Sequence, residues 1–167
     1  MNAAGWECRG QRVGLRTAEP ADQAFFRDLY GSTREEELAI VPWSDEAKRA
    51  FLDQQFHAQS QHYAVHCPDA EFAVIVTGGV GIGRLYVHRR AGDIRIMEMA
   101  LVPEWRRCGL GTAILRSLQE EAAASARKLS IHVEKFNPAR RLYERLGFAV
   151  RADVGVHWLM EWEPPVS

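Results

Sequence analysis

The sequence is short of cysteine and of long apolar runs, and each shortage removes a class of protein. Only 3 of the 167 residues are cysteine. Cys8, Cys67 and Cys108 form neither an even disulfide set nor a close C-x-x-C pair, so we expect free thiols in a reducing compartment. No stretch approaches the roughly 18 apolar residues of a membrane span, and the first residues lack the apolar run of a signal peptide. We therefore expect a cytoplasmic protein without a membrane partner.

The chain also carries almost no net charge. The formal net charge is -1 at pH 7, whereas proteins that bind the nucleic-acid backbone normally carry a clustered basic surface. We therefore expect no nucleic-acid partner. The composition is that of an ordinary globular chain, with 47% hydrophobic and 26% charged residues, and no linker or repeat divides it. The prediction is a single domain over residues 1–167, with a core at about 13–163.

The spacing of apolar residues predicts a mixed α/β sheet with helices on both faces, in the order β-α-α-β-β-β-α-β-α-β-β. Gly31 is expected to end the first helix, and Ser44 is expected to cap the next one. A strand, a helix and a second strand between 94 and 133 indicate a right-handed parallel crossover. The expected strands cover 13–17, 72–77, 80–88, 94–102, 128–133, 148–154 and 156–163. The expected helices cover 21–30, 45–61, the segment after Gly109, and 138–146, with a short helical turn or an ordered loop at 32–37.

A turn rich in arginine and glycine follows the strand that ends at Val102. Its spacing is R-x-x-G-x-G from Arg106 to Gly111, and it opens an amphipathic helix. The apolar stripe of that helix is Leu110, Ile114, Leu115, Leu118 and Ala122. The first N–H groups of a helix lack intrahelical partners, and the helix dipole favours negative charge there. The turn is no Walker A loop, because Thr112 follows Gly111 directly where that loop needs a lysine. The spacing favours phosphate binding over a purely structural turn.

A second motif lies at 137–148, NPARRLYERLGF. Asn137 stands at a helix cap position, and Gly147 stands where a helix end favours a left-handed residue. Together with VPEWRRCGLG at 102–111, it resembles the GCN5-related N-acetyltransferase (GNAT) superfamily. The family motifs are R/Q-x-x-G-x-G/A and, here in shifted form, N-x-x-A-x-x-x-Y-x-x-x-G-F. The resemblance implies a GNAT fold of the α+β type, with a mixed, mostly antiparallel sheet of six to seven strands and helices on both faces.

The resemblance also implies acetyl-CoA as the donor and direct transfer of its acetyl group to a primary amine. The backbone of the strand before the turn would pair with the pantetheine, the turn would hold the diphosphate, and the thioester would enter a gap where this strand splays from the next. Asn137 would cap the helix, contact the cofactor, or do both. The expected cofactor-binding residues are Ala100, Leu101, Val102, Arg106, Arg107, Cys108, Gly109, Leu110, Gly111, Thr112, Asn137 and Arg140. No metal is expected, because His57, His62 and His66 lack further ligands at suitable spacing.

Glu98 is a candidate for the base that the chemistry needs. Removing a proton from an ammonium with a pKa near 10 costs about 4 kcal/mol at pH 7. By strand alternation Glu98 shares a face with Ile94, Ile96 and Ala100. The alternative is a carboxylate paired with an arginine across the sheet, and the sequence does not choose between the two roles.

Tyr143 occupies the position where many family members place the acid that protonates the leaving CoA thiolate. Its alternative role is core packing with a locally satisfied hydroxyl. Cys108 is not expected to be a nucleophile, because no His/Asp partnership is visible and the family transfers the acyl group directly.

The acceptor is a small-molecule amine or the amine of a peptide or protein, and the sequence does not say which. Candidates to line its pocket are Glu35, Glu36, Glu37, Trp43, His62 and Tyr63; the three glutamates could equally form a solvated acidic face. The main alternative function is a non-catalytic acyl-CoA-binding or regulatory domain, and a third is a nucleotide-binding fold unrelated to CoA. The C-terminal hairpin around 157–160 could pair its edge in a homodimer or could belong to the core.

Overall fold

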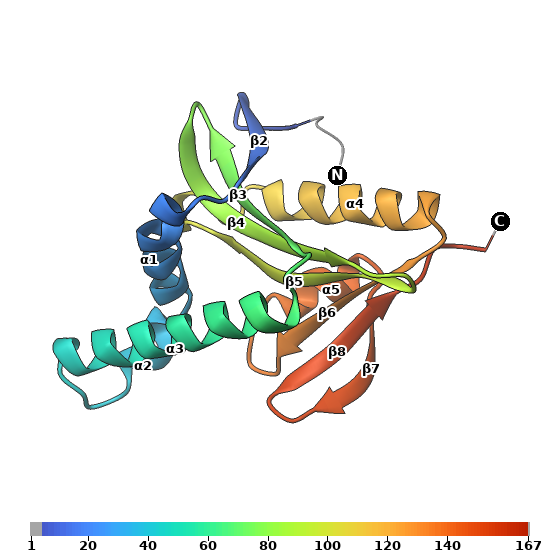
Figure 1. The fold of residues 1–167 in the computed structure, drawn as a ribbon. Helices are drawn as coiled ribbons and strands as arrows, with labels where there is room; N and C mark the ends of the chain where they lie inside the picture. The colour runs from blue at the N-terminus through green and yellow to red at the C-terminus, as the bar shows by residue number, and fades with distance from the viewer. Residues whose placement is uncertain (1–4, 167) are drawn as a thin grey trace.

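The computed structural model describes residues 5–166, so residues 1–4 and 167 of the predicted domain lie outside the described residues. The described chain forms one eight-stranded sheet in the order β1-β2-β3-β4-β5-β6-β8-β7 (Figure 1). The strands are β1 Trp6–Cys8, β2 Gln11–Thr17, β3 Glu71–Thr77, β4 Val80–Arg89, β5 Asp93–Leu101, β6 Lys128–Glu134, β7 Ala149–Val154 and β8 His157–Trp162. The helices are α1 Gln23–Thr33, α2 Glu35–Ala39, α3 Asp45–His66, α4 Leu110–Ala124 and α5 Arg140–Arg145, with 3-10 turns at Pro20–Asp22 and Pro103–Trp105.

The sheet has the expected class but one strand more than expected. β5 and β6 pair in parallel, and the other neighbours pair antiparallel. This confirms the mixed, mostly antiparallel sheet and the crossover through α4. The additional strand, β1, turns into β2 through Arg9 and Gly10, both with positive φ (55° and 71°). Its three residues are too few to show the alternation from which a strand is inferred.

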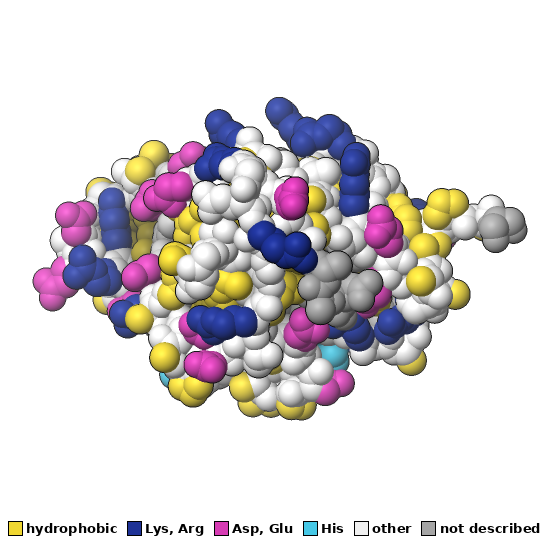
Figure 2. Space-filling model, turned by 90° about the horizontal axis from the view of Figure 1, so that it is seen from above, with side chains coloured by type: hydrophobic (Ala, Val, Ile, Leu, Met, Phe, Trp, Pro, Cys, Tyr) yellow, Lys and Arg dark blue, Asp and Glu magenta, His cyan; other side chains and the backbone are white. Residues whose placement is uncertain are grey.

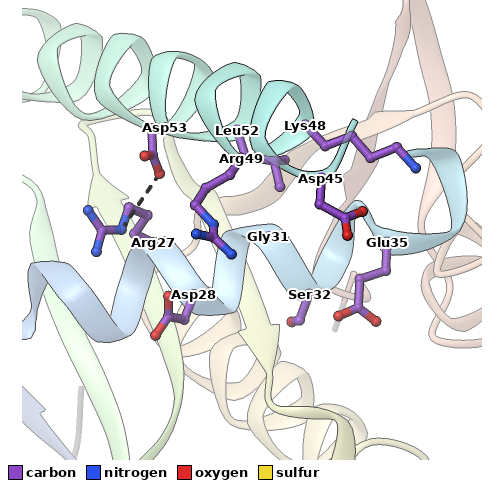
Figure 3. Close-up of a pocket in the computed structure, with 10 residues that line it drawn as sticks. All are labelled: Arg27, Asp28, Gly31, Ser32, Glu35, Asp45, Lys48, Arg49, Leu52 and Asp53. Carbon is purple, nitrogen blue, oxygen red and sulfur yellow. Dashed lines mark ion pairs between the residues drawn. The ribbon is translucent and has the colours of Figure 1, made fainter. Parts of the chain in front are cut away.

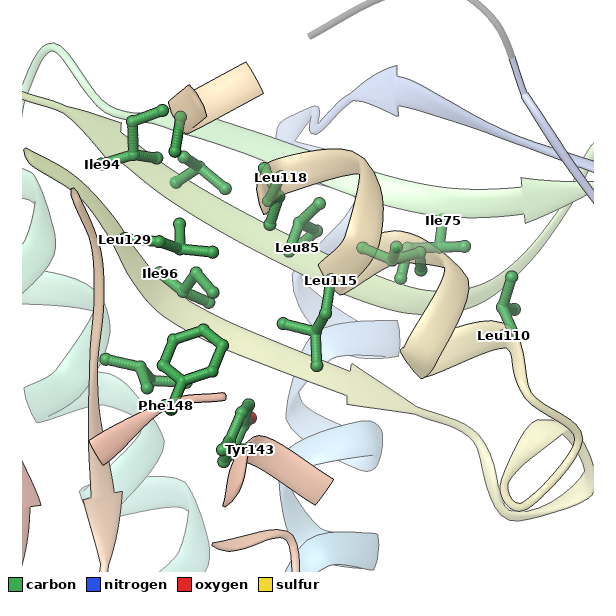
Figure 4. Close-up of a cluster of buried hydrophobic side chains, with 14 of the residues drawn as sticks. Ile75, Leu85, Ile94, Ile96, Leu110, Leu115, Leu118, Leu129, Tyr143 and Phe148 are labelled. Carbon is green, nitrogen blue, oxygen red and sulfur yellow. The ribbon is translucent and has the colours of Figure 1, made fainter. Parts of the chain in front are cut away.

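Helices cover both faces of the sheet, as expected. On one face, α4 buries its predicted stripe, from Leu110 to Ala122, against Ile94, Ile96 and the rest of the larger core (Figure 4). On the other face, Phe26 of α1 and Phe56 of α3 pack with Val74 and Tyr86 of the sheet. Successive sheet residues such as Val74 and Ile75 therefore belong to opposite cores.

Several expected helix ends are wrong. Gly31 does not end α1, which continues to Thr33; it lies inside the helix, where a Cβ would make an ordinary contact with Leu52 at 3.5 Å. The helix from Asp45 continues to His66 instead of ending near residue 61. Ser44 does cap it, since its hydroxyl accepts from the Ala47 N–H at 3.1 Å.

In the C-terminal hairpin, the strand named in the dimer hypothesis is not at the edge of the sheet. Residues 157–160 lie in β8, which pairs with β6 on one side and β7 on the other, and Met160 is fully buried. The free edge at this end of the sheet is β7.

The described surface is mixed in charge. Basic and acidic side chains intermingle over the face that carries α4 (Figure 2). Within residues 5–166, no helix has both the length and the hydropathy needed to cross a membrane.

Candidate active site

The sheet opens where β5 and β6 part. Their parallel pairing runs from Asp93 and Lys128 to Ile96 and Ile131 and then stops, although β5 continues to Leu101 and β6 to Glu134. Beyond that point β5 pairs only with β4, and β6 only with β8. The sheet therefore has an inner strand edge whose backbone groups have no partner strand.

The backbone direction along β5 decides which residues face this gap. The Val102 N–H donates to the Ile82 carbonyl at 2.8 Å, so Val102 faces β4. Successive residues of a strand direct their backbone groups to opposite sides, which turns Ala100 toward β4 and turns Met99 and Leu101 toward the gap. The Leu101 carbonyl accordingly accepts from Nε of Arg106 at 2.8 Å. Of the three residues expected to pair with a pantetheine, Leu101 therefore directs its backbone groups to the gap, whereas Ala100 and Val102 direct theirs to β4.

The turn after β5 presents an uncapped helix start. Arg107 and Gly109 adopt left-handed conformations, with φ of 58° and 86°. Gly109 is the N-cap of α4 and supplies no side-chain bond, and the first turn of the helix holds no acidic residue. Arg107 is exposed and makes no hydrogen bond or ion pair with residues 5–166. Free N–H groups, a helix dipole and an unpaired guanidinium are the features that could hold a phosphate-bearing ligand.

Arg106 makes contacts within the chain that its motif did not indicate. Besides the Leu101 carbonyl, its guanidinium donates through Nη2 to the Ser32 hydroxyl at 2.9 Å. The side chain therefore ties the end of β5 to the end of α1. Ser32 lies in the last turn of α1.

A β-bulge in β5 changes the face of the sheet on which the Glu98 side chain lies. Tyr86 pairs with Glu98, but Val87 pairs with Ile96, so Met97 is an extra residue in β5. The shift turns Glu98 to the face of Tyr86 and α3. The expectation that Glu98 shares a face with Ile94 and Ile96 is therefore wrong, because simple alternation does not hold across a bulge.

Glu98 lies in a polar network under α3. Its Oε2 accepts from Nε2 of Gln59 at 3.2 Å and lies 3.5 Å from Nη2 of Arg84. Arg84 is only 1% exposed, donates to Oε1 of Gln59 at 3.2 Å, and has its guanidinium 5.1 Å from the Tyr86 ring centre. The Nε of Arg84 is buried without a partner among the described residues. The arginine pairing considered for Glu98 is thus present.

Sequence reasoning missed Arg84 and Gln59. The signal for Arg84 was available, since it is the one charge in the apolar run VGIGRLYV of β4. A charged side chain in a buried strand requires a buried partner. Gln59 carried no signal, because its position on α3 becomes meaningful only once the helix is packed.

Tyr143 lies on α5 and belongs to the core that α4 covers, together with Ile96 and Leu115. The side chain is 4% exposed, and its ring meets that of Phe148 edge-on at 5.6 Å (Figure 4). Its hydroxyl makes no hydrogen bond with the described residues, so the expected alternative of a locally satisfied hydroxyl is wrong. Burial raises the pKa of the Tyr143 hydroxyl, and the negative charge of Glu98 raises that pKa further.

Asn137 and Arg140 both have partners within the chain. The helix that Asn137 was expected to cap starts later, at Arg140 with Ala139 as N-cap, but Oδ1 of Asn137 does accept from the Ala139 N–H at 2.9 Å. Arg140 pairs with Glu144 at 2.7 Å and lies over the Trp158 ring at 5.4 Å. The capping part of the Asn137 expectation thus applies to the turn before α5.

Among the expected acceptor residues, Tyr63 reaches the Glu98 network. Its hydroxyl donates to the Met97 carbonyl at 3.3 Å, and burial, followed by the charge of Glu98, raises its pKa. Glu35 instead lines a groove of about 740 Å³ between α1 and α3, where both signs of charge meet (Figure 3). The remaining candidates are surface residues.

These surface candidates are engaged elsewhere or exposed. Glu37 pairs with Arg34, Trp43 meets Phe51 edge-on, His62 lies against His66, and Glu36 is exposed. Arg34 also forms a bidentate ion pair with Glu134 at the end of β6. That pair fixes the start of α2 beside the open end of the gap.

Comparison with known proteins agrees with this architecture. A family model described as "Acetyltransferase (GNAT) domain" matches residues 68–150, about half of the chain, from just before β3 to the start of β7. The matched part holds the gap, the turn, α4 and α5. The chain belongs to the GNAT superfamily. No curated protein matches the sequence.

Solved structures resemble this GNAT protein over nearly their whole length. The PaiA N-acetyltransferase of Thermoplasma acidophilum, crystallised with coenzyme A, has a TM-score of 0.69 and 15% identity, covering 90% of this chain and 98% of that one. A GNAT-family putative acetyltransferase of Desulfovibrio desulfuricans gives 0.61 and 19%, covering 90% and 98%. A GCN5-related N-acetyltransferase of Rhodopseudomonas palustris gives 0.62 and 17%, covering 90% and 94%. At these identities the likeness establishes the fold alone.

Proposed function

We propose that this GNAT protein is an acetyl-CoA-dependent N-acetyltransferase that transfers the acetyl group directly to a primary amine. The observation that supports this most strongly is the alignment of three features along one path. The uncapped start of α4 follows directly after β5, whose inner edge has no partner strand. Glu98 lies on this same strand, and Tyr143 lies in the core against which Met99 and Leu101 of the strand pack. The amine belongs to a small molecule, a peptide or a protein.

The residues for the cofactor divide into two groups. The N–H groups from Gly109 to Thr112, with the free guanidinium of Arg107, would hold the diphosphate. The backbone of Met99 and Leu101 would pair with the amides of the pantetheine arm, as an added strand would. Arg106 would position the turn by holding the Leu101 carbonyl and Ser32. No metal is required for these contacts.

The chemical step needs a proton acceptor for the amine and a proton donor for the departing thiolate. Glu98, oriented by Gln59 and Arg84, would attract an ammonium acceptor and take its proton, directly or through a water. The neutral amine then attacks the thioester carbonyl. Tyr143 would give its hydroxyl proton to the thiolate. The ordinary tyrosine pKa of about 10 already keeps this hydroxyl protonated at neutral pH, and the upward shift of that pKa makes it a weaker acid until the thiolate charge develops beside it.

A thiol-release assay tests the proposal. Purified protein is incubated with acetyl-CoA and a panel of amines, and free CoA is followed with a thiol reagent beside calorimetric measurement of CoA binding. We expect CoA binding and amine-dependent thiol release above hydrolysis. Tight CoA binding without release across a broad panel would favour the non-catalytic acyl-CoA-binding domain. A melting temperature that rises with ATP or NAD but not with CoA would favour an unrelated nucleotide-binding role.

A matched pair of glycine substitutions separates ligand contact from folding. Gly109 has a φ of 86°, so Gly109→Ala should cost about 1–2 kcal/mol of stability. At Gly111 the nearest side-chain atoms to an added Cβ, on Met99 and Leu142, lie 3.9 Å away. Gly111→Ala should therefore fold as well as the wild type, with a helix-propensity gain of at most about 1 kcal/mol.

If the diphosphate approaches the backbone of the turn, Gly111→Ala will nevertheless weaken CoA binding. Calorimetry gives the CoA dissociation constant, and thermal denaturation gives the stability of both variants. An unchanged dissociation constant in a fully folded Gly111→Ala protein would place the diphosphate elsewhere.

A further inference from the structure

Two cysteines that are far apart in sequence meet beside the turn that opens α4. Sγ of Cys8, in β1, lies 3.2 Å from Sγ of Cys108 and 3.5 Å from the Cys108 carbonyl oxygen. Both thiols are free. Cys8 is 9% exposed, whereas Cys108 is partly exposed and its thiol donates to the Trp105 carbonyl at 2.9 Å.

The elements that carry the two thiols are fixed against each other. β1 pairs with β2 over its three residues, and Nε1 of Trp6 donates to the Ser117 hydroxyl of α4 at 2.8 Å. The Arg9 guanidinium lies 5.3 Å from the centre of the Trp105 ring in the turn. A disulfide needs a sulfur–sulfur distance of about 2.05 Å, so the two sulfurs have to approach by only about 1 Å.

We propose that Cys8 and Cys108 form a reversible disulfide when a hydroperoxide or a small-molecule disulfide oxidises the protein. This disulfide lowers the affinity of the α4 turn for its ligand. The disulfide itself is independent of the proposed function. Its effect on ligand affinity rests on the proposed function, because acetyl-CoA is the ligand assigned to the turn.

The reaction balances with either oxidant. With a hydroperoxide, the partly exposed Cys108 thiol is oxidised to a sulfenic acid and the peroxide is reduced to water or an alcohol. The Cys8 thiol then attacks that sulfur, forms the S–S bond and releases water. With glutathione disulfide, two exchange steps release two molecules of glutathione. A dithiol reductant returns both cysteines to thiols and is itself oxidised to a disulfide.

The bond would act on the turn because Cys108 directly precedes Gly109, the N-cap of α4. Oxidation removes the proton that Cys108 donates to Trp105 and draws the turn toward β1. The backbone N–H groups that would hold a diphosphate follow in the next residues, so a shift of about 1 Å misplaces them. We expect the dissociation constant for acetyl-CoA to rise at least about fivefold, the lower end of usual coupling between sites.

Intact-mass spectrometry and peptide mapping test the bond itself. After treatment with glutathione disulfide, the wild type and Cys67→Ser should lose two hydrogens and yield a Cys8–Cys108 cross-linked peptide. Cys8→Ser and Cys108→Ser should not. A wild type that stays reduced, carries only glutathione adducts, or links through Cys67 would overturn the proposal.

Calorimetry with acetyl-CoA, whose sulfur is blocked and cannot reduce the bond, tests the coupling. The oxidised wild type should bind more weakly than the reduced wild type, and Cys8→Ser should bind like the reduced wild type before and after oxidant. By linkage, saturating acetyl-CoA should lower the equilibrium constant for oxidation by the same factor. Equal affinity of both redox forms would overturn control of the turn.

The two proposals fail in different ways. A cross-linked peptide in a protein that binds no acetyl-CoA in either redox state would refute the proposed function and, with it, the control of acetyl-CoA binding. The cysteine pairing would still stand on the mass result.

Discussion

Tyr143→Phe is expected to lower kcat by about 10²-fold or more, the usual contribution of a positioned proton donor, with little change in folding or in CoA affinity. The reason lies in the surroundings of the residue. The ring is buried and packs on Phe148, whereas the hydroxyl bonds to none of residues 5–166. Removing the oxygen therefore leaves packing intact and removes only the proton. Steady-state kinetics with a responsive amine, with thermal denaturation and CoA calorimetry in parallel, measures this.

Tyr143→Ala serves as the contrasting variant. It removes the ring as well and should cost about 3–5 kcal/mol of stability, as for other buried aromatic residues. A Phe variant with wild-type kcat would remove Tyr143 from the mechanism and leave it a core residue. A Phe variant that loses turnover only because it unfolds would be recognised from its melting temperature.

Glu98→Gln is expected to lower kcat by at least about 10²-fold for an alkylamine acceptor. Glutamine keeps the size of the side chain and can still accept from Gln59, but it neither attracts an ammonium nor takes its proton. The penalty should depend on the acceptor. An alkylamine with a pKa near 10 needs about 4 kcal/mol to lose its proton at pH 7, whereas an acceptor with a pKa below 7 is already neutral.

A series of acceptors with decreasing amine pKa therefore tests the role of Glu98. The ratio of wild-type to Glu98→Gln turnover should shrink along the series. Glu163→Gln, at an exposed position just after β8, is the matched control and should give a ratio near one throughout. A constant, large ratio would assign Glu98 a structural role in its pairing with Arg84 and not that of a base.

The parts of the fold that were predictable have local causes. The stripe from Leu110 to Ala122 follows from the helical period, and the parallel crossover follows from the strand, helix and strand that contain it. Gly147, expected to be left-handed at the end of α5, has a φ of 91°.

The parts that failed depend on contacts distant in sequence. The bulge at Met97 is a property of the pairing between two strands, so nothing in β5 alone shows that Glu98 turns toward α3. The motif also gave no sign that Arg106 donates to Ser32, which lies 74 residues away, while its role as a phosphate ligand stays a prediction. The contact of Cys8 with Cys108 joins a strand too short to be recognised to a turn 100 residues later.

The unpaired inner edge of β5 has an evolutionary consequence. A ligand arm that docks there would be recognised by peptide groups, which every residue except proline supplies in the same form. Side chains along such an edge can change without altering the recognition surface, provided that the strand keeps its extended course and its bulge. Sequences can then diverge widely around a common mode of docking. The three structures compared above differ from this chain at more than four positions in five, with identities of 15%, 19% and 17%, and retain its fold.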